Sequence, residues 1–174
     1  MRALVTITVI ILNFLNFEKL YASNEITYLD LDKIIIESLA GKSITKKITS
    51  IQKKNNESLE AKEKKLFEKE KSIISKKNIL QEKDFNEKVK AFKKEVNEYQ
   101  KNRSKLIKEI NQKKLNAISQ LLDKLNPILA RYSNEKSISM IVQKKNIIIG
   151  KSELDITNDI MKILDNEIKK INIK

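Results

Sequence analysis

The sequence contains no cysteine, no histidine and no tryptophan. These absences exclude disulfides, thiol nucleophiles and imidazole bases, and they remove the usual ligands of zinc. A bound metal would need carboxylates alone, and Asp30, Asp32 and Glu37 stand in no glycine-containing calcium loop. No glycine-rich phosphate loop and no paired nucleophile and base are recognisable. We therefore expect no enzymatic activity, no metal and no cofactor.

Glycine and proline are also scarce, with two glycines and one proline in 174 residues. Between Gly41 and Pro127 lie 85 positions without either residue. Because these two residues are the strongest local breakers, the stretch predicts helix far longer than the globular norm. One straight helix would extend roughly 125 Å, whereas each limb of a hairpin would span roughly 60 Å at 1.5 Å per residue.

Apolar residues in the second half of this stretch recur at alternating spacings of four and three. The positions are Phe85, Val89, Phe92, Val96, Tyr99, Arg103, Leu106 and Ile110, with Arg103 as the interruption. This 3.5-residue period predicts a coiled-coil seam. The first half has a looser seam with polar residues at Asn55 and Lys62. The pattern loses phase between Ser75 and Asp84, which favours an antiparallel helical hairpin with its tip near residues 75–84.

Charge is concentrated in the same stretch. The formal net charge of the chain is +13, and residues 42–124 hold 24 basic and 12 acidic side chains. Mixed lysine and glutamate on a helix is ordinarily a solvated face with local ion pairs. The uncompensated lysines repel one another, so they predict an acidic partner. A biased, lysine-rich composition is the alternative explanation.

The first residues have the pattern of an export signal. Met1 and Arg2 are followed by an apolar run from Ala3 to Phe17, which is short for a membrane span but typical of a signal-peptide core. We expect residues 1–22 to be a signal peptide cleaved after Ala22, with an uncleaved anchor as the alternative. The mature chain would then be periplasmic.

The segments flanking the helical stretch predict a small α+β body, residues 23–41 and 125–174. We expect a strand in Glu25–Asp32, a helical turn at 33–37, and a backbone turn at Gly41 that releases the arm, residues 42–124. Asn126 and Pro127 permit a kink or a new helix start. Two further strands are expected at 137–142 and 146–149, before a last helix with Thr157 as its N-cap.

Such a body is marginal alone, so we expect it to oligomerise through its strands. The residues predicted for this role are Ile26, Tyr28, Leu29, Ile138, Met140, Val142, Ile147 and Ile149.

The order of these elements resembles the Skp (OmpH-like) periplasmic chaperones over the whole mature chain. The motifs that carry the resemblance are Glu37-Ser38-Leu39-Ala40-Gly41-Lys42 before the arm and Asp155-Ile156-Thr157 before the last helix. The resemblance implies a homotrimer with a shared β body and three arms that enclose unfolded outer-membrane proteins. The expected third strand lacks the family's terminal aromatic residue. Lysine replaces the arginine common in relatives, so a lipopolysaccharide patch cannot be carried over to particular positions.

These observations favour an ATP-independent holdase that attracts clients through lysine and touches them through scattered apolar side chains. The residues predicted for client contact are Phe67, Ile74, Lys76, Lys77, Lys83, Phe85, Phe92 and Tyr99, with packing in the seam as the alternative for the aromatic ones. An exported protein that binds lipopolysaccharide, an anionic membrane surface or another polyanion is the second hypothesis, although export makes nucleic acid an unexpected partner. A structural coiled-coil spacer is the third.

Overall fold

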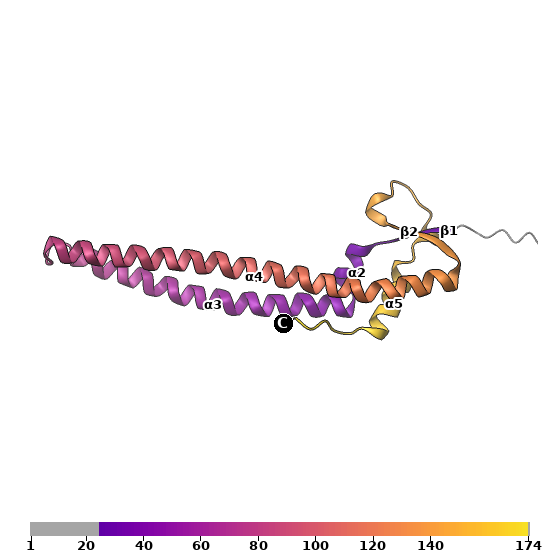
Figure 1. Ribbon diagram of the computed structural model, residues 1–174, viewed down its shortest axis with the longest axis horizontal. Coiled ribbons are helices and arrows are strands. Elements are labelled where there is room, and N and C mark those ends of the chain that lie inside the picture. The colour runs from indigo at the N-terminus through magenta and orange to yellow at the C-terminus, as the bar shows by residue number, and fades with distance from the viewer. Residues whose placement is uncertain (1–24, 174) are drawn as a thin grey trace, which may run out of the picture.

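The computed structural model describes residues 25–173 as a long helical arm projecting from a small body (Figure 1). In chain order the elements are β1 (Glu25–Leu29), α2 (Leu31–Glu37), α3 (Leu39–Ser75), α4 (Glu82–Lys136), β2 (Ile138–Gln143), the 3-10 helices η1 (Lys144–Asn146) and η2 (Ser152–Leu154), and α5 (Thr157–Glu167). The expected signal peptide lies outside the described residues. Within residues 25–173, no helix combines the length and apolarity needed to cross a membrane.

The predicted helical hairpin is confirmed, because α3 and α4 lie side by side and reverse direction at residues 76–81 (Figure 1). At the end of α3, the N–H of Lys76 donates to the Ile73 carbonyl at 3.2 Å, and α4 begins after Gln81, whose carbonyl accepts from Phe85. The two helices contain 37 and 55 residues. At 1.5 Å per residue they span about 55 and about 80 Å. The longer α4 therefore passes the root of α3 and continues into the body.

Burial along α4 follows the predicted heptad seam. The side chains at the seam positions from Phe85 to Leu106 are half-buried, apart from Arg103, and Ile110 is buried. Arg103 is exposed, and the neighbouring Asn102 is half-buried in its place. On α3 the facing seam includes the polar Asn55. The seam is therefore apolar near the root and the tip of the arm and more polar between them.

Gly41 does not form the predicted turn but lies inside α3. The break between α2 and α3 is at Ser38, whose extended backbone ends α2 and whose hydroxyl accepts from the N–H of Gly41 at 3.0 Å. A Cβ atom added to Gly41 would lie 2.0 Å from the carbonyl oxygen of Ile35. The glycine is required because α2 and α3 approach too closely at this point for any side chain, not because the backbone turns there.

Pro127 neither ends α4 nor starts a new helix. Proline in a helix interior removes one backbone hydrogen bond and crowds the carbonyl four residues earlier, at a cost of about 3 kcal/mol. Leu125 and Ile128, on either side of it, are almost completely buried in the main core. Burial of each such side chain contributes about 1.5–3 kcal/mol, so packing on this face offsets the defect.

The body contains two parallel strands rather than the three predicted. β1 and β2 pair in parallel, with Tyr28 opposite Val142, and the helical hairpin connects them. The prediction of a third strand at residues 146–149 is wrong, because this segment begins in η1 and continues as irregular chain. Consecutive isoleucines favour a strand only where a neighbouring strand can satisfy their backbone groups. Within residues 25–173 the sheet has two strands and does not extend to this segment.

A single apolar core joins the body to the root of the arm. Side chains from β1, α2, α3, α4 and α5 meet there; the largest fully buried ones are Ile34, Leu121, Leu125, Ile128, Ile160 and Leu164. Thr157 is the first residue of α5 and not its N-cap, a position that Ile156 occupies without a side-chain bond. Instead, the carboxylate of Asp155 accepts from the N–H of Thr157 at 3.0 Å. The sequence motif before α5 therefore fixes the helix start through its first and third residues.

Candidate functional site

The aromatic residues predicted to contact a client divide into two groups. Phe85, Phe92 and Tyr99 lie on the seam of α4 and are half-buried. Their inner surface packs towards α3, so only their outer edges face solvent. Phe67 and Ile74 on α3 are instead more than half exposed. Three of the predicted contact residues therefore pack in the seam, and Phe67 and Ile74 are accessible on the outer surface of the arm.

Phe67 and Ile74 form part of a distal apolar patch. They stand seven residues apart, so they share one face of α3, and Ile79 in the turn is also exposed. The ammonium group of Lys71 lies 4.4 Å from the centre of the Phe67 ring. Cation–π contacts of this kind hold charge beside apolar surface. The outer third of the arm therefore presents apolar and positive groups side by side.

The three predicted tip lysines, Lys76, Lys77 and Lys83, are all exposed. Lys76 and Lys77 lie in the turn, and Lys83 lies in the first turn of α4. The N-terminal turn of a helix is the end that favours anions, and Glu82 and Asp84 also stand there. The start of α4 is therefore mixed in charge, whereas the turn carries the positive charge of Lys76 and Lys77.

A longer basic feature runs along α4 and was missed in the sequence. Lysines recur at spacings of seven, four and three residues on the helix face opposite the seam, and we call them the lysine row. Its members are Lys83, Lys90, Lys94, Lys101, Lys105 and Lys108, all of them exposed. Glu87 and Asn97 fill the intervening positions of the same row. The signal was available, because the row repeats with the spacing of the seam at an offset of half a turn.

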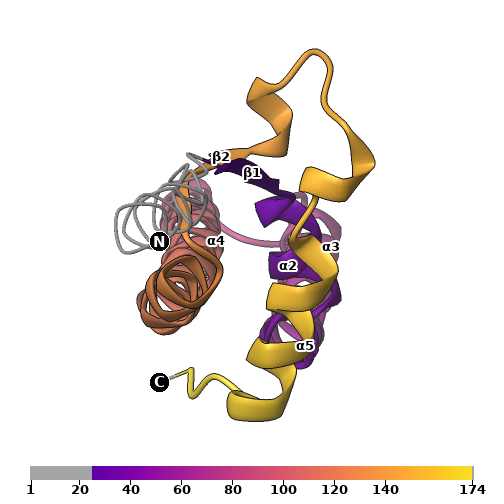
Figure 2. The same cartoon turned by 90° about the vertical axis from the view of Figure 1, so that its right-hand side faces the viewer.

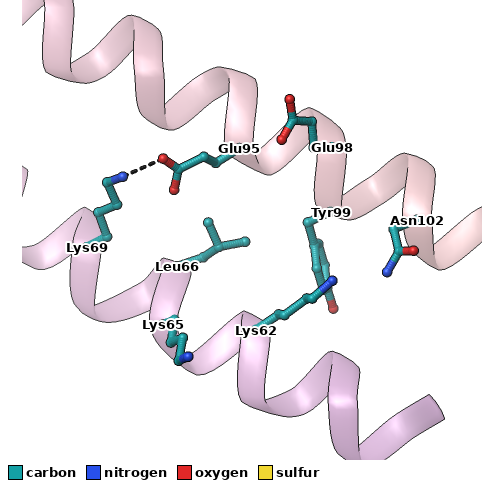
Figure 3. Close-up of a pocket in the computed structure, with 8 residues that line it drawn as sticks. All are labelled: Lys62, Lys65, Leu66, Lys69, Glu95, Glu98, Tyr99 and Asn102. Carbon is teal, nitrogen blue, oxygen red and sulfur yellow. Dashed lines mark hydrogen bonds and ion pairs between the residues drawn. The ribbon is translucent and has the colours of Figure 1, made fainter.

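A cavity of about 460 Å³ lies between the two limbs of the arm (Figure 3). Lys62, Lys65, Leu66 and Lys69 contribute from α3, and Glu95, Glu98, Tyr99 and Asn102 contribute from α4. An ion pair between Lys69 and Glu95 closes one end, as Figure 3 shows. The cavity coincides with the polar part of the seam. Its ammonium, carboxylate and phenol groups suit an amphipathic side chain better than a purely apolar one.

The predicted oligomerisation residues occupy both faces of the small sheet. Ile26 and Met140 are paired across the two strands and are exposed. Leu29 is buried on the opposite face, in the protein's own core. Tyr28 is covered by the loop after β2, since a Cβ on Gly150 would lie 3.1 Å from its ring. Ile138, Val142 and Ile147 are half-buried, and Ile149 is exposed.

The loop after β2 stands away from the helices (Figure 2) and is held by charge at its base. Lys144 donates to Asp155 at 3.0 Å, and this hydrogen bond raises the pKa of Lys144. Burial alone would raise the pKa of Asp155, but hydrogen bonds from Thr157 and Lys144 outweigh it and lower that pKa. Further along, Ile148 and Ile149 are fully or almost fully exposed. The loop therefore carries exposed apolar surface of its own.

Comparison with known proteins identifies the family. The family model for outer membrane protein (OmpH-like) matches residues 25–164. The chain belongs to the OmpH-like family. The resemblance drawn from the sequence motifs is thereby confirmed. Among curated proteins no match was found.

A solved structure has the same fold as this OmpH-like protein. It is the crystal structure of a candidate outer membrane chaperone (OmpH-like) from Caulobacter crescentus CB15. The two chains superpose with a TM-score of 0.78 at 18% sequence identity, over 84% of this chain and 87% of the other. Since so few residues are identical, the likeness shows the architecture of arm and body and does not identify individual contact residues.

Proposed function

We propose that this protein is an ATP-independent holdase chaperone of the periplasm that binds unfolded outer-membrane proteins along its basic arm. The observation that carries the proposal is the lysine row of α4, together with the exposed Phe67 and Ile74 on α3. Family membership and the fold shared with a candidate outer membrane chaperone support it. Export would require the segment 1–22, cleaved after Ala22, to act as the signal.

The mechanism follows from how the two kinds of surface act over distance. Lysines attract a net-acidic client from beyond contact range, since charges act over a Debye length of about 8 Å at physiological salt. Apolar side chains such as Phe67 then give short-range contact. Strands of outer-membrane proteins alternate apolar and polar residues, so a surface with interspersed apolar and charged groups shields one set while it solvates the other. Many weak contacts also permit release.

Oligomerisation through the body would place several arms around one client. We propose that the exposed face of the sheet, with Ile26 and Met140, joins the loop isoleucines of neighbouring copies in a homotrimer. A two-stranded sheet with exposed apolar residues is stabilised by further strands. The mass of the mature protein in solution, measured with and without a denatured client, tests this arrangement; a trimer that gains one client mass supports it, and a monomer contradicts it.

The holdase activity is tested by aggregation of a urea-denatured outer-membrane protein diluted into buffer. We expect the wild-type protein to slow aggregation, and added salt to weaken the effect. A variant with Lys90→Gln, Lys94→Gln and Lys101→Gln should lose several-fold in protection at low salt, because it removes the middle of the lysine row. The matched control is Lys145→Gln, Lys151→Gln and Lys162→Gln, which removes the same charge from the body and should retain protection.

Two results would contradict the mechanism. Failure of the wild-type protein to slow aggregation would leave a structural spacer as the better interpretation. Equal loss in the arm and body variants would show that net charge alone matters.

The lysine row also favours a second function, binding of lipopolysaccharide or another anionic surface. Phosphate binding through dense positive charge has a steep salt dependence and needs little apolar contact. Substitution of Phe67 and Ile74 by serine separates the two functions. Client protection should fall with these substitutions, whereas binding to lipopolysaccharide micelles should be unchanged.

A further inference from the structure

After α5 the chain turns back from the body along the root of the arm (Figure 1). Residues 168–173, which we call the tail, form neither helix nor strand. Figure 2 shows the tail crossing from α5 towards the side of the arm on which α4 lies. The tail also lies beyond residues 25–164, the part that matches the family model. Its position is therefore a feature of this chain that family membership does not explain.

The tail contacts both limbs of the arm. Ile171 is only 3% exposed and belongs to the main core. Its backbone N–H donates to the hydroxyl of Ser43 on α3 at 3.1 Å. Asn172 and Ile173 border a cavity of about 420 Å³. The remaining walls of that cavity come from α4 and consist of Lys113, Asn116, Ala117 and Gln120. The tail thus lies in a groove between the two helices.

The tail lies in the groove as an extended segment. Ile171 is buried, Asn172 is exposed and Ile173 is half-buried, which is the alternation that an extended chain gives. Ala117, at 1% exposure, leaves room because its side chain is a single methyl group. The cavity beside Ile173 shows that the groove is larger than the tail fills. A longer or bulkier extended segment would therefore find additional space in it.

We propose that this groove is a binding site for extended segments with alternating apolar side chains, and that the tail is its resident occupant. The inference rests on the proposed function for the identity of the incoming segment, a strand of an unfolded outer-membrane protein, because such strands alternate apolar and polar residues. A client strand displaces the tail, and the tail returns to the groove when the client leaves. The tail therefore lowers the affinity for clients and favours their release.

The groove itself is tested without any client. The probe is a fluorescent peptide with the sequence of residues 165–174, added to a full-length variant with Ile171→Asp and Ile173→Asp, whose own tail cannot stay seated. We expect saturable binding of the peptide, and no binding of a control peptide in which both isoleucines are replaced by asparagine. Binding of both peptides, or of neither, would overturn the proposal.

Displacement is tested with a synthetic strand peptide that alternates apolar and polar residues. This peptide should compete with the fluorescent tail peptide. It should also bind the variant with Ile171→Asp and Ile173→Asp, which we call the tail-released variant, at least about threefold more tightly than it binds the wild-type protein, because an internal competitor has been removed. The matched control is Lys169→Gln with Lys170→Gln, two exposed positions of the same tail, which should leave the affinity at the wild-type value. Equal affinity in wild type and tail-released variant would refute the competition.

A second variant keeps the test valid if burial of two aspartates disturbs the fold. Ser43→Ala removes the hydroxyl that accepts from Ile171 and leaves the apolar groove intact, so it should raise the affinity for the strand peptide in the same direction. Failure of the inference appears as unchanged peptide affinity in a protein that still slows aggregation. If the proposed function is wrong, the wild-type protein will not slow aggregation of the denatured outer-membrane protein, whatever the tail peptide does.

Discussion

The backbone N–H of Asp30, at the end of β1, donates a 2.8 Å hydrogen bond to the hydroxyl of Thr157, 127 positions away at the start of α5. The same hydroxyl donates to the carboxylate of Asp155, which also accepts from Lys144. This network joins the first strand, the loop after the second strand and the last helix. The residues Asp155-Ile156-Thr157 therefore close the body after the long excursion of the chain through the arm.

Thr157→Val should destabilise the protein by about 1–3 kcal/mol, because it removes the hydroxyl while keeping the shape of the side chain and leaves buried polar groups unpaired. Urea unfolding followed by circular dichroism measures the change. Thr157→Ser keeps the hydroxyl and should restore most of the stability. Equal stability of the valine and serine variants would show that the network contributes nothing.

Asp155 should make part of the stability dependent on pH. Its pKa is lower in the folded protein than the ordinary value, so the folded state binds its proton more weakly than the unfolded state. The stabilisation is therefore present above the unfolded pKa of about 4 and is lost as the pH falls through the folded pKa. In urea unfolding, the stability difference between wild type and Asp155→Asn should shrink between about pH 5 and about pH 2. Glu153→Gln is the control, and a constant difference for Asp155→Asn would contradict the linkage.

Gly41→Ala should destabilise the protein strongly, although alanine is favoured over glycine in helices by about 1 kcal/mol. The added Cβ would lie 2.0 Å from the carbonyl oxygen of Ile35, so α2 and α3 would have to separate. Gly150→Ala is the comparison, since its Cβ would meet only side chains, the nearest being the Tyr28 ring at 3.1 Å. Thermal unfolding should show a much larger loss for the first variant. A stabilised Gly41→Ala protein would mean that the helices do not meet so closely.

Ile110 and Ile107 on α4 provide a matched test of the arm seam. Ile110 is 8% exposed and Ile107 is 51% exposed. Ile110→Ala should cost about 2–4 kcal/mol in the free energy of unfolding, because it leaves a cavity between the limbs, whereas Ile107→Ala should cost well under about 1.5 kcal/mol. Urea unfolding of both variants checks the difference. Similar costs at the two positions would contradict the side-by-side packing of α3 and α4.

Much of the arm could be predicted because its signals are local and repeated. The seam from Phe85 to Ile110 recurs every 3.5 residues, and its loss of phase near Ser75 indicated where the chain reverses. The lysine row of α4 was equally periodic but was overlooked among the many other lysines. Apolar periodicity shows which face of a helix packs, and it also fixes the face that remains in solvent.

The candidate contact residues were less accessible to sequence reasoning. Phe67 and Phe92 have the same chemistry and lie on two similar charged helices, yet Phe67 is exposed and Phe92 is half-buried. On α3 the seam is loose, so the face that packs could be recognised only once α4 lay against it.

The sequence by itself determined the helical hairpin, its basic surface and the family, because helix periodicity, charge and motif order are properties of neighbouring residues. Only the tertiary structure decided the role of Gly41, the continuation of α4 past Pro127, the absence of a strand at 146–149 and the position of the tail against the arm. Each of these depends on residues distant in sequence: a carbonyl on α2, a core around Ile128, a missing neighbouring strand, and a hydroxyl on α3. Local propensities differ by about 1–3 kcal/mol, and contacts of this kind are large enough to override them.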